Sequence, residues 1–229
     1  MRSGIIKRTK NLFLSGSIQQ LLIVPCSFSL LLLFIRILFT GTMTYAFLPW
    51  NLFLAFIPLW VSHWLFKNFS LVKWYKLIPA LMGWILFLPN SFYLITDLFH
   101  LTYNTTVPKW FDLLMIFSFA WNGILCGFLA LNRMEQLFAR LRLKNFSILI
   151  IFSILWLCAF GIYIGRYLRF NSWDVITDPL SLFSEIIYMV IHPFRNYHAW
   201  GMVCGYSVFI TVLYFTIKKF GEGFKNPTP

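Results

Sequence analysis

Charged residues are scarce in this sequence, and acidic residues are the scarcest. Only 11% of the 229 residues are charged, with 7 Asp and Glu against 19 Lys and Arg. A soluble domain of this length needs far more charge to cover its surface. The net charge of +12 is not accompanied by a basic face or a binding module, so nucleic acid is not an expected partner.

Several catalytic signatures are missing as well. The sequence contains no HExxH motif, no GxSxG elbow, no Walker loop and no Rossmann glycine fingerprint. No CxxC pair occurs, because the cysteines stand singly in apolar runs, at Cys26, Cys126, Cys158 and Cys204. We interpret them as small buried hydrophobic residues rather than as disulfide partners or zinc ligands.

Long apolar runs are what the sequence has in abundance. Hydrophobic residues make up 59% of the chain, and the mean hydropathy is +0.75. Runs of about 20 mostly apolar residues are long enough to cross a bilayer. They predict an all-α, polytopic integral membrane protein with one transmembrane domain over residues 1–229. The six expected spans are residues 18–39, 46–66, 77–94, 110–131, 146–166 and 199–218.

The distribution of charge predicts how the chain is oriented. Most Lys and Arg residues fall in alternate connecting segments, which are expected to face the cytoplasm, so both termini are predicted to lie inside. The first apolar run is too long for a cleaved signal peptide. Most of the few acidic residues then lie on the outer side, namely Asp97, Asp112, Asp174, Asp178 and Glu185.

Two similar polar segments fall on that outer side. The first polar segment, residues 90–97, reads NSFYLITD, and the second polar segment, residues 171–178, reads NSWDVITD. Chance similarity and a duplicated helical hairpin both remain explanations. In either case we expect the two segments to form two rims of one outer pocket. The candidate site residues are Asn90, Asp97, His100, Asp112, Arg166, Arg169, Asn171, Trp173 and Asp174.

Local signals predict how this outer region is built. Asp178 followed by Pro179 is typical of a helix start, and the apolar run to about residue 191 is too short to span a bilayer. A re-entrant or interfacial helix is therefore expected near 179–191. Pro89 should kink or end the third span near the outer face. GxxxG pairs in the last two spans predict that these helices cross closely beneath the outer cluster.

The segments LPNSFYLITDLFHL and GIYIGRYLRFNSWDV carry a family resemblance. They resemble the signature segments of a family of bacterial multi-spanning membrane proteins that is catalogued only as a domain of unknown function. The resemblance runs from about the second span to the sixth. It implies an integral membrane fold in the bacterial cytoplasmic membrane and a shared outer constellation, and it brings no known activity, substrate or cofactor.

Binding of a small polar or anionic ligand is the first function that the outer residues suggest. Arg166 and Arg169 lie three residues apart on one helix face, and guanidinium groups bind phosphate or carboxylate well. Asn171 and Trp173 would shape the pocket. The alternative is a structural Arg–Asp network that locks helix ends together. The acidic residues expected to pair with the two arginines are Asp97, Asp112 and Asp174.

Two other functions remain open. In a metal-dependent enzyme, Asp97 and His100 would supply two ligands from one helical turn, which suits zinc or manganese. The residues that could complete such a site are Asp112, Asp174, His192 and His198. The alternative is that His100 only forms an interfacial hydrogen bond. The third function is a non-catalytic assembly factor, whose aromatic surface packs against lipid and other membrane proteins.

Overall fold

The computed structural model describes residues 18–69, 71–101, 107–141 and 146–225, and all regular structure in these ranges is helical. Six of the helices are long and apolar enough to cross a membrane, which confirms the expected all-α polytopic fold. The elements are α2 (Ile18–Thr40), α3 (Phe47–Asn68), α4 (Trp74–Tyr93), η1 (Leu94–His100), α5 (Lys109–Arg140), α6 (Ser147–Tyr163), η3 (Ile164–Leu168), α7 (Asp174–Thr177), α8 (Pro179–Ile191) and α9 (Tyr197–Lys225).

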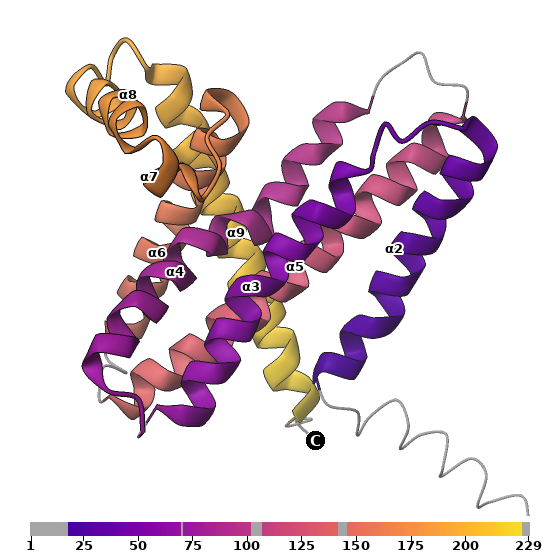
Figure 1. Ribbon diagram of the computed structural model, residues 1–229. Coiled ribbons are helices and arrows are strands. Elements are labelled where there is room, and N and C mark those ends of the chain that lie inside the picture. The colour runs from indigo at the N-terminus through magenta and orange to yellow at the C-terminus, as the bar shows by residue number, and fades with distance from the viewer. Residues whose placement is uncertain (1–17, 70, 102–106, 142–145, 226–229) are drawn as a thin grey trace, which may run out of the picture.

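Helix α5 forms the centre of the bundle. It contacts α2, α3, α4 and α6, and it contributes fully buried side chains such as Phe119, Leu131 and Met134. Figure 1 shows α2 as an outlying helix against one end of α5, while α6 and α9 cross on the other side. Large apolar side chains remain exposed on the outer helices, as expected for surfaces that meet lipid.

Glycines on α5 allow α4 to approach closely. A Cβ at Gly123 would lie 2.5 Å from the carbonyl oxygen of Ser91, and one at Gly127 would lie 2.7 Å from the ring of Phe92. Neither gap leaves room for a side chain. The GxxxG pair of α5 therefore fixes the end of α4, the part of the chain that carries the first polar segment.

The predicted contact between the last two spans exists, but its glycines do not make it. Helices α6 and α9 pack together, yet a Cβ at Gly201 or Gly205 would meet nothing within 4 Å. Gly161 instead faces Pro89. The contact between the helices includes a stack of aromatic rings from Trp156, Phe160 and Trp200, whose centroids are about 6 Å apart. Side-chain packing that includes this ring stack, rather than close approach at Gly201 and Gly205, joins these helices.

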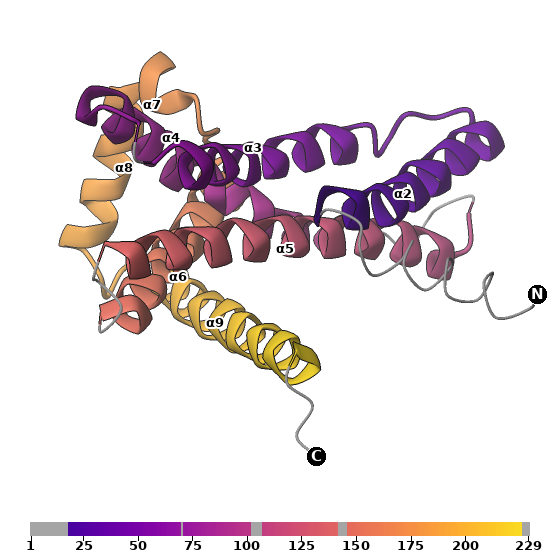
Figure 2. The same cartoon turned by 90° about the horizontal axis from the view of Figure 1, so that it is seen from below.

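The short apolar helix α8 lies across one end of the bundle. Asp178 caps it, since its Oδ1 accepts a hydrogen bond from the Ser181 backbone N–H at 3.4 Å, and Pro179 occupies the first turn as expected. Figures 1 and 2 show that α8 crosses the direction of the long helices. It buries Leu182 and Met189 and exposes Phe183 and Ile187. This arrangement favours an interfacial helix over a re-entrant one.

The transition after α4 differs in detail from the expectation. Pro79 and Pro89 are both accommodated inside α4, which continues as a helix to Tyr93. The chain then tightens into the 3-10 helix η1, which carries Asp97 and His100. Pro89 therefore does not end the third span.

Candidate functional site

A direct hydrogen bond joins the two polar segments. The Nδ2 group of Asn90 donates to Ser172 Oγ at 2.9 Å, and Ser172 Oγ in turn donates to the backbone oxygen of Leu86 at 3.3 Å. The two segments have different conformations, because the first is helical while the second begins irregularly before α7. They nevertheless meet at one place, 82 residues apart in the chain.

A cavity of about 310 Å³ lies beside this junction. Its walls come from α3, α4, α6, η3, α7, α8 and the loop between η3 and α7. Most lining residues are apolar or aromatic, and none of the described residues that line it is charged. The polar side chains that face it are amides and hydroxyls, from Asn51, Asn90, Tyr93, Asn171 and Ser172. Such a mixture of apolar walls and a few convergent polar groups is typical of small-molecule sites.

Asp97, Arg166 and His100 form a compact cluster next to the cavity. The Asp97 side chain is 1% exposed and accepts a hydrogen bond from Asn51 Nδ2 at 3.1 Å. Arg166 Nη1 lies 3.6 Å from Asp97 Oδ1, an ion-pair distance that is too long for a hydrogen bond. The same Nη1 lies 2.9 Å from His100 Nε2. Because a guanidinium only donates, His100 accepts through Nε2 and is neutral.

Unusual backbone geometry surrounds the cluster. Asp97 and His100 lie on a 3-10 helix, and Arg166 lies on a short π-helix, η3. Arg169 follows with φ of +62°, the only positive φ among the described non-glycine residues. Irregular helical turns and left-handed residues occur often at functional sites. These irregularities set where Arg166 and the second polar segment lie.

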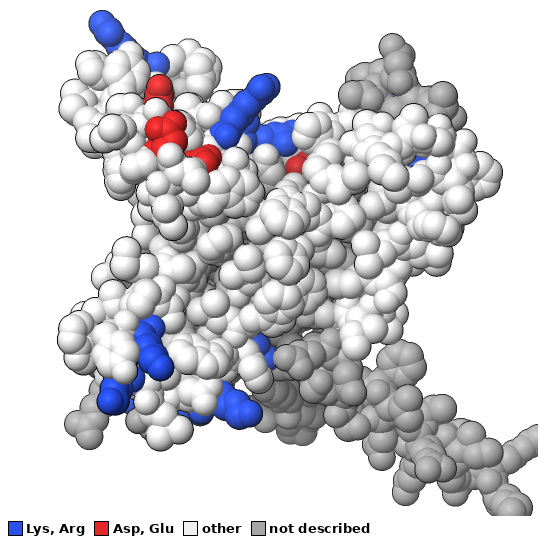
Figure 3. All heavy atoms as spheres, in the orientation of Figure 1, with Lys and Arg blue, Asp and Glu red and all other residues white. Residues whose placement is uncertain are grey.

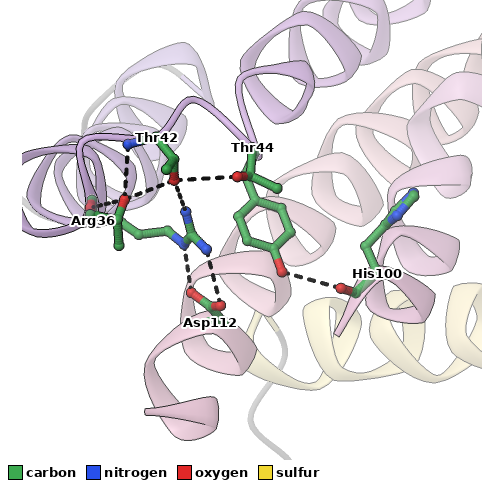
Figure 4. Close-up of polar contacts among 7 residues, drawn as sticks. Arg36, Thr42, Thr44, His100 and Asp112 are labelled. Atoms are coloured by element: carbon green, nitrogen blue, oxygen red, sulfur yellow. Dashed lines mark hydrogen bonds and ion pairs between the residues drawn. The ribbon is translucent and has the colours of Figure 1, made fainter. Parts of the chain in front are cut away.

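Asp112 has a different partner from the one expected. Its Oδ1 accepts from Arg36 Nε at 2.8 Å and its Oδ2 from Arg36 Nη2 at 3.4 Å, with both side chains at most 5% exposed. Figure 4 shows this pair together with Thr42, to which Arg36 Nη1 donates at 3.4 Å. Asp112 therefore belongs to a buried α2–α5 contact and does not pair with Arg166 or Arg169.

Tyr45 lies between the Arg36–Asp112 pair and the cluster of Asp97, Arg166 and His100. The guanidinium carbon of Arg36 lies 4.4 Å from the centre of the Tyr45 ring. Burial raises the pKa of the Tyr45 phenol, the Asp112 carboxylate raises it further, and Arg36 opposes both. The phenol therefore stays protonated at neutral pH and is available as a hydrogen-bond donor.

Asp174 is also engaged locally. Its Oδ2 accepts from the backbone N–H of Asn171 at 2.6 Å, and its Oδ1 accepts from Thr177 Oγ1 at 2.8 Å. These bonds, the backbone one foremost, lower the pKa of the Asp174 carboxyl. Asp174 thus closes the turn that presents Asn171. In the described part of the chain it forms no ion pair with either arginine.

Trp173 and Arg169 lie at the edge of the site. The Trp173 ring meets the Trp50 ring edge-on at 6.5 Å, and Trp50 lines the cavity. Arg169 is exposed, and the ion pairs of the described residues do not include it. The expected clamp of two arginines is therefore not assembled, since Arg166 faces Asp97 while Arg169 faces outward from the bundle surface.

The residues proposed as metal ligands do not gather in one place. In the described ranges no three His, Cys, Asp or Glu side chains lie close enough to hold one ion. Arg166 contacts both Asp97 and His100, so a metal ion at that pair would face a guanidinium. His192 is turned toward the Tyr188 backbone oxygen, and the His198 ring contacts the Tyr197 ring at a tilt of 35°. The arrangement does not fit the metal-dependent reading.

Three polar residues that line the cavity are absent from the candidates named from the sequence: Tyr93 and Ser172, which lie within the two polar segments, and Asn51. Asn51 is the one outside both segments. It faces the cavity and also donates to Asp97, so it connects the two parts of the site. An isolated amide inside an apolar span is the signal that could have identified it, since polar side chains within spans usually face protein or a cavity.

The fold and the site together define a helical membrane protein of the multi-pass class, with six candidate spanning helices. Within that class, the chain belongs to the family described as "Protein of unknown function (DUF1361)", which matches residues 50–213. The matched range includes both polar segments and the whole cavity lining. No curated protein and no solved structure matches the chain.

Proposed function

We propose that the protein binds a polar ligand in the cavity between the two polar segments. The hydrogen bond between Asn90 and Ser172 carries this proposal, because it places both segments at one cavity. Amide and hydroxyl groups on otherwise apolar walls would orient a ligand, and the apolar walls would supply most of the affinity. The neighbouring Asp97–Arg166 pair supports the cavity through Asn51.

The proposal also covers the membrane in which the protein lies and the orientation of the chain across it. We infer a bacterial cytoplasmic membrane, with both termini in the cytoplasm and the cavity opening to the outer side. In Figure 3, Asp and Glu side chains appear at the upper end of the molecule, while only Lys and Arg appear among the charged residues of the lower end. That asymmetry supports the orientation, because cytoplasmic loops are enriched in Lys and Arg.

A cavity-filling variant tests ligand binding directly. Ile186 and Ile187 are neighbours on α8, but only Ile186 lines the cavity, while Ile187 is 54% exposed. Ile186→Trp would fill the cavity, and Ile187→Trp would add the same bulk outside it. We expect native mass spectrometry of protein released from membranes to show a small molecule bound to wild type and to Ile187→Trp.

The same species should be lost from Ile186→Trp. Thermal unfolding of both variants checks that each one is folded. A wild-type protein that carries nothing beyond what Ile186→Trp also carries would contradict the proposed function.

A further inference from the structure

The side-chain amides around the cavity all donate hydrogen bonds through their nitrogen atoms to oxygen atoms of the protein. Asn51 Nδ2 donates to the Asp97 carboxylate at 3.1 Å, and Asn90 Nδ2 donates to the Phe87 backbone oxygen at 3.1 Å as well as to Ser172. Asn171 Nδ2 donates to the Asp174 carboxylate at 3.4 Å. In each case at least one partner is an oxygen that only accepts, so it fixes which end of the amide is nitrogen.

As a consequence, the carbonyl oxygens of these amides remain free to accept hydrogen bonds. The Oδ1 atoms of Asn51, Asn90 and Asn171 accept no hydrogen bond from any described residue. Both N–H groups of Asn90 are already used, and the Ser172 hydroxyl hydrogen is committed to Leu86. The polar side of the cavity therefore offers three carbonyl acceptors. Its uncharged donors are the Tyr93 hydroxyl and the second N–H groups of Asn51 and Asn171, for which no partner is found among the described residues.

This pattern selects against a charged ligand of either sign. A buried anion needs a cationic partner, but no described lining residue is charged, and Arg166 is engaged by Asp97 and His100. A cation needs a counter-ion, and no carboxylate is among the described lining residues. Burying an unpaired charge among apolar walls is costly. Uncharged hydroxyl groups both donate and accept, so they can pair with the carbonyl oxygens and with the uncharged donors without that cost.

The aromatic and apolar residues of the lining indicate what the other parts of the ligand are. Trp50, Phe160 and Phe170 contribute aromatic rings to the lining, and the π-face of an aromatic ring carries partial negative charge that favours the C–H groups of a sugar ring. Leu54, Ile85 and similar residues make apolar walls beyond the amides. A hydrocarbon tail would lie against such walls more favourably than water.

We propose that the cavity takes an amphiphile with an uncharged polyhydroxyl head, such as a glycosyl group, and a hydrocarbon tail. The proposal rests on the proposed function of ligand binding and names the class of ligand. The head hydroxyls donate to the carbonyl oxygens of Asn51, Asn90 and Asn171, and the tail lies along the apolar walls.

Three probes with the same tail and different heads test the proposal. Octyl glucoside, octyl sulfate and octyltrimethylammonium are titrated, each below its micelle concentration, into protein held in an amphipathic polymer. Tryptophan emission is the readout, since Trp50 lines the cavity. We expect a saturable change with octyl glucoside and at least tenfold weaker binding of both charged probes.

Two variants locate the effect. Asn171→Ala removes one acceptor from a loop residue and should weaken octyl glucoside binding about fivefold, as for one neutral hydrogen bond. Asn68→Ala is the control, since Asn68 lies at the other end of α3, outside the cavity lining, and its Nδ2 group donates to the Trp64 backbone oxygen. It should leave binding unchanged.

The outcomes separate this inference from the proposed function. Equal or tighter binding of octyl sulfate or octyltrimethylammonium would overturn the glycosyl inference while leaving a ligand site in place. Binding of octyl glucoside that Asn171→Ala does not change would overturn it too, as would no saturable binding of any probe. The proposed function falls only if Ile186→Trp also retains everything that wild type binds.

Discussion

The Tyr45 hydroxyl donates a hydrogen bond to the backbone oxygen of His100 at 3.2 Å. Its ring covers the guanidinium of Arg36, which is paired with Asp112, and His100 contacts Arg166, which is paired with Asp97. One tyrosine thus connects the two acid–base pairs at this end of the bundle. The segment after α2 and the 3-10 helix η1 are held in one network through it.

Breaking the buried Arg36–Asp112 pair should destabilise the fold. Arg36→Ala leaves an uncompensated buried carboxylate, which typically costs about 3–5 kcal/mol. The double variant Arg36→Met with Asp112→Leu removes both charges and should recover most of that loss. Thermal and denaturant unfolding in detergent measures both, with Lys219→Ala, an exposed cation, as control. A single variant as stable as wild type would show that the pair contributes nothing.

Gly123 and Gly201 form a matched pair for testing helix approach. Gly123→Ala would place a Cβ 2.5 Å from the Ser91 backbone oxygen, so we expect a loss of about 1–3 kcal/mol from overpacking. Gly201→Ala meets nothing within 4 Å and replaces a helical glycine, so it should be neutral or stabilise by up to about 1 kcal/mol. Unfolding curves of the two variants compare them. Equal effects on the free energy of unfolding would mean that the close contact between α4 and α5 does not exclude a side chain at position 123.

The left-handed conformation of Arg169 predicts a substitution that stabilises the fold. With φ at +62°, Arg169→Gly relieves the cost of a side chain in this region, of the order of 1 kcal/mol. We expect a higher unfolding temperature for Arg169→Gly and a lower one for Arg169→Val, whose branched side chain tolerates this conformation poorly. A reversed order would refute the strain at this position.

Cysteine labelling tests the orientation. Ser184→Cys on exposed α8 should react with a membrane-impermeant maleimide added to intact cells, and Lys219→Cys near the end of α9 should react only after lysis. The exposed native thiol, Cys204, is replaced by Ala in both. The opposite labelling pattern would turn the cavity toward the cytoplasm and remove the argument for an outward-facing site.

Local patterns in the sequence predicted the helices well and the site in part. The six spans, the Asp178–Pro179 helix start and the meeting of the two polar segments follow from the length of the apolar runs, capping and charge distribution. The partners of the acidic residues do not. Arg36 and Asp112 are 76 residues apart, and nothing local distinguishes Arg36 from Arg166 as a partner. Such pairings depend on how the helices pack.

The GxxxG pairs show the same limit of prediction from local sequence. All the GxxxG pairs look alike in sequence, yet Gly123 and Gly161 face α4, whereas Gly201 faces open space. A small-residue motif marks a surface that allows close approach. Which helix uses that surface is decided by the neighbours that the fold supplies.

The ring stack of Trp156, Phe160 and Trp200 gives the molecule a built-in optical reporter. The centres of the two indole rings lie 6.0 Å apart at an interplanar angle of 19°, close enough for their electronic transitions to couple and contribute to the circular dichroism of the protein. Phe160, stacked on both, also lines the cavity. An occupant that shifts the Phe160 ring alters the surroundings of both indoles, so filling of the cavity should change the tryptophan spectra of unlabelled protein.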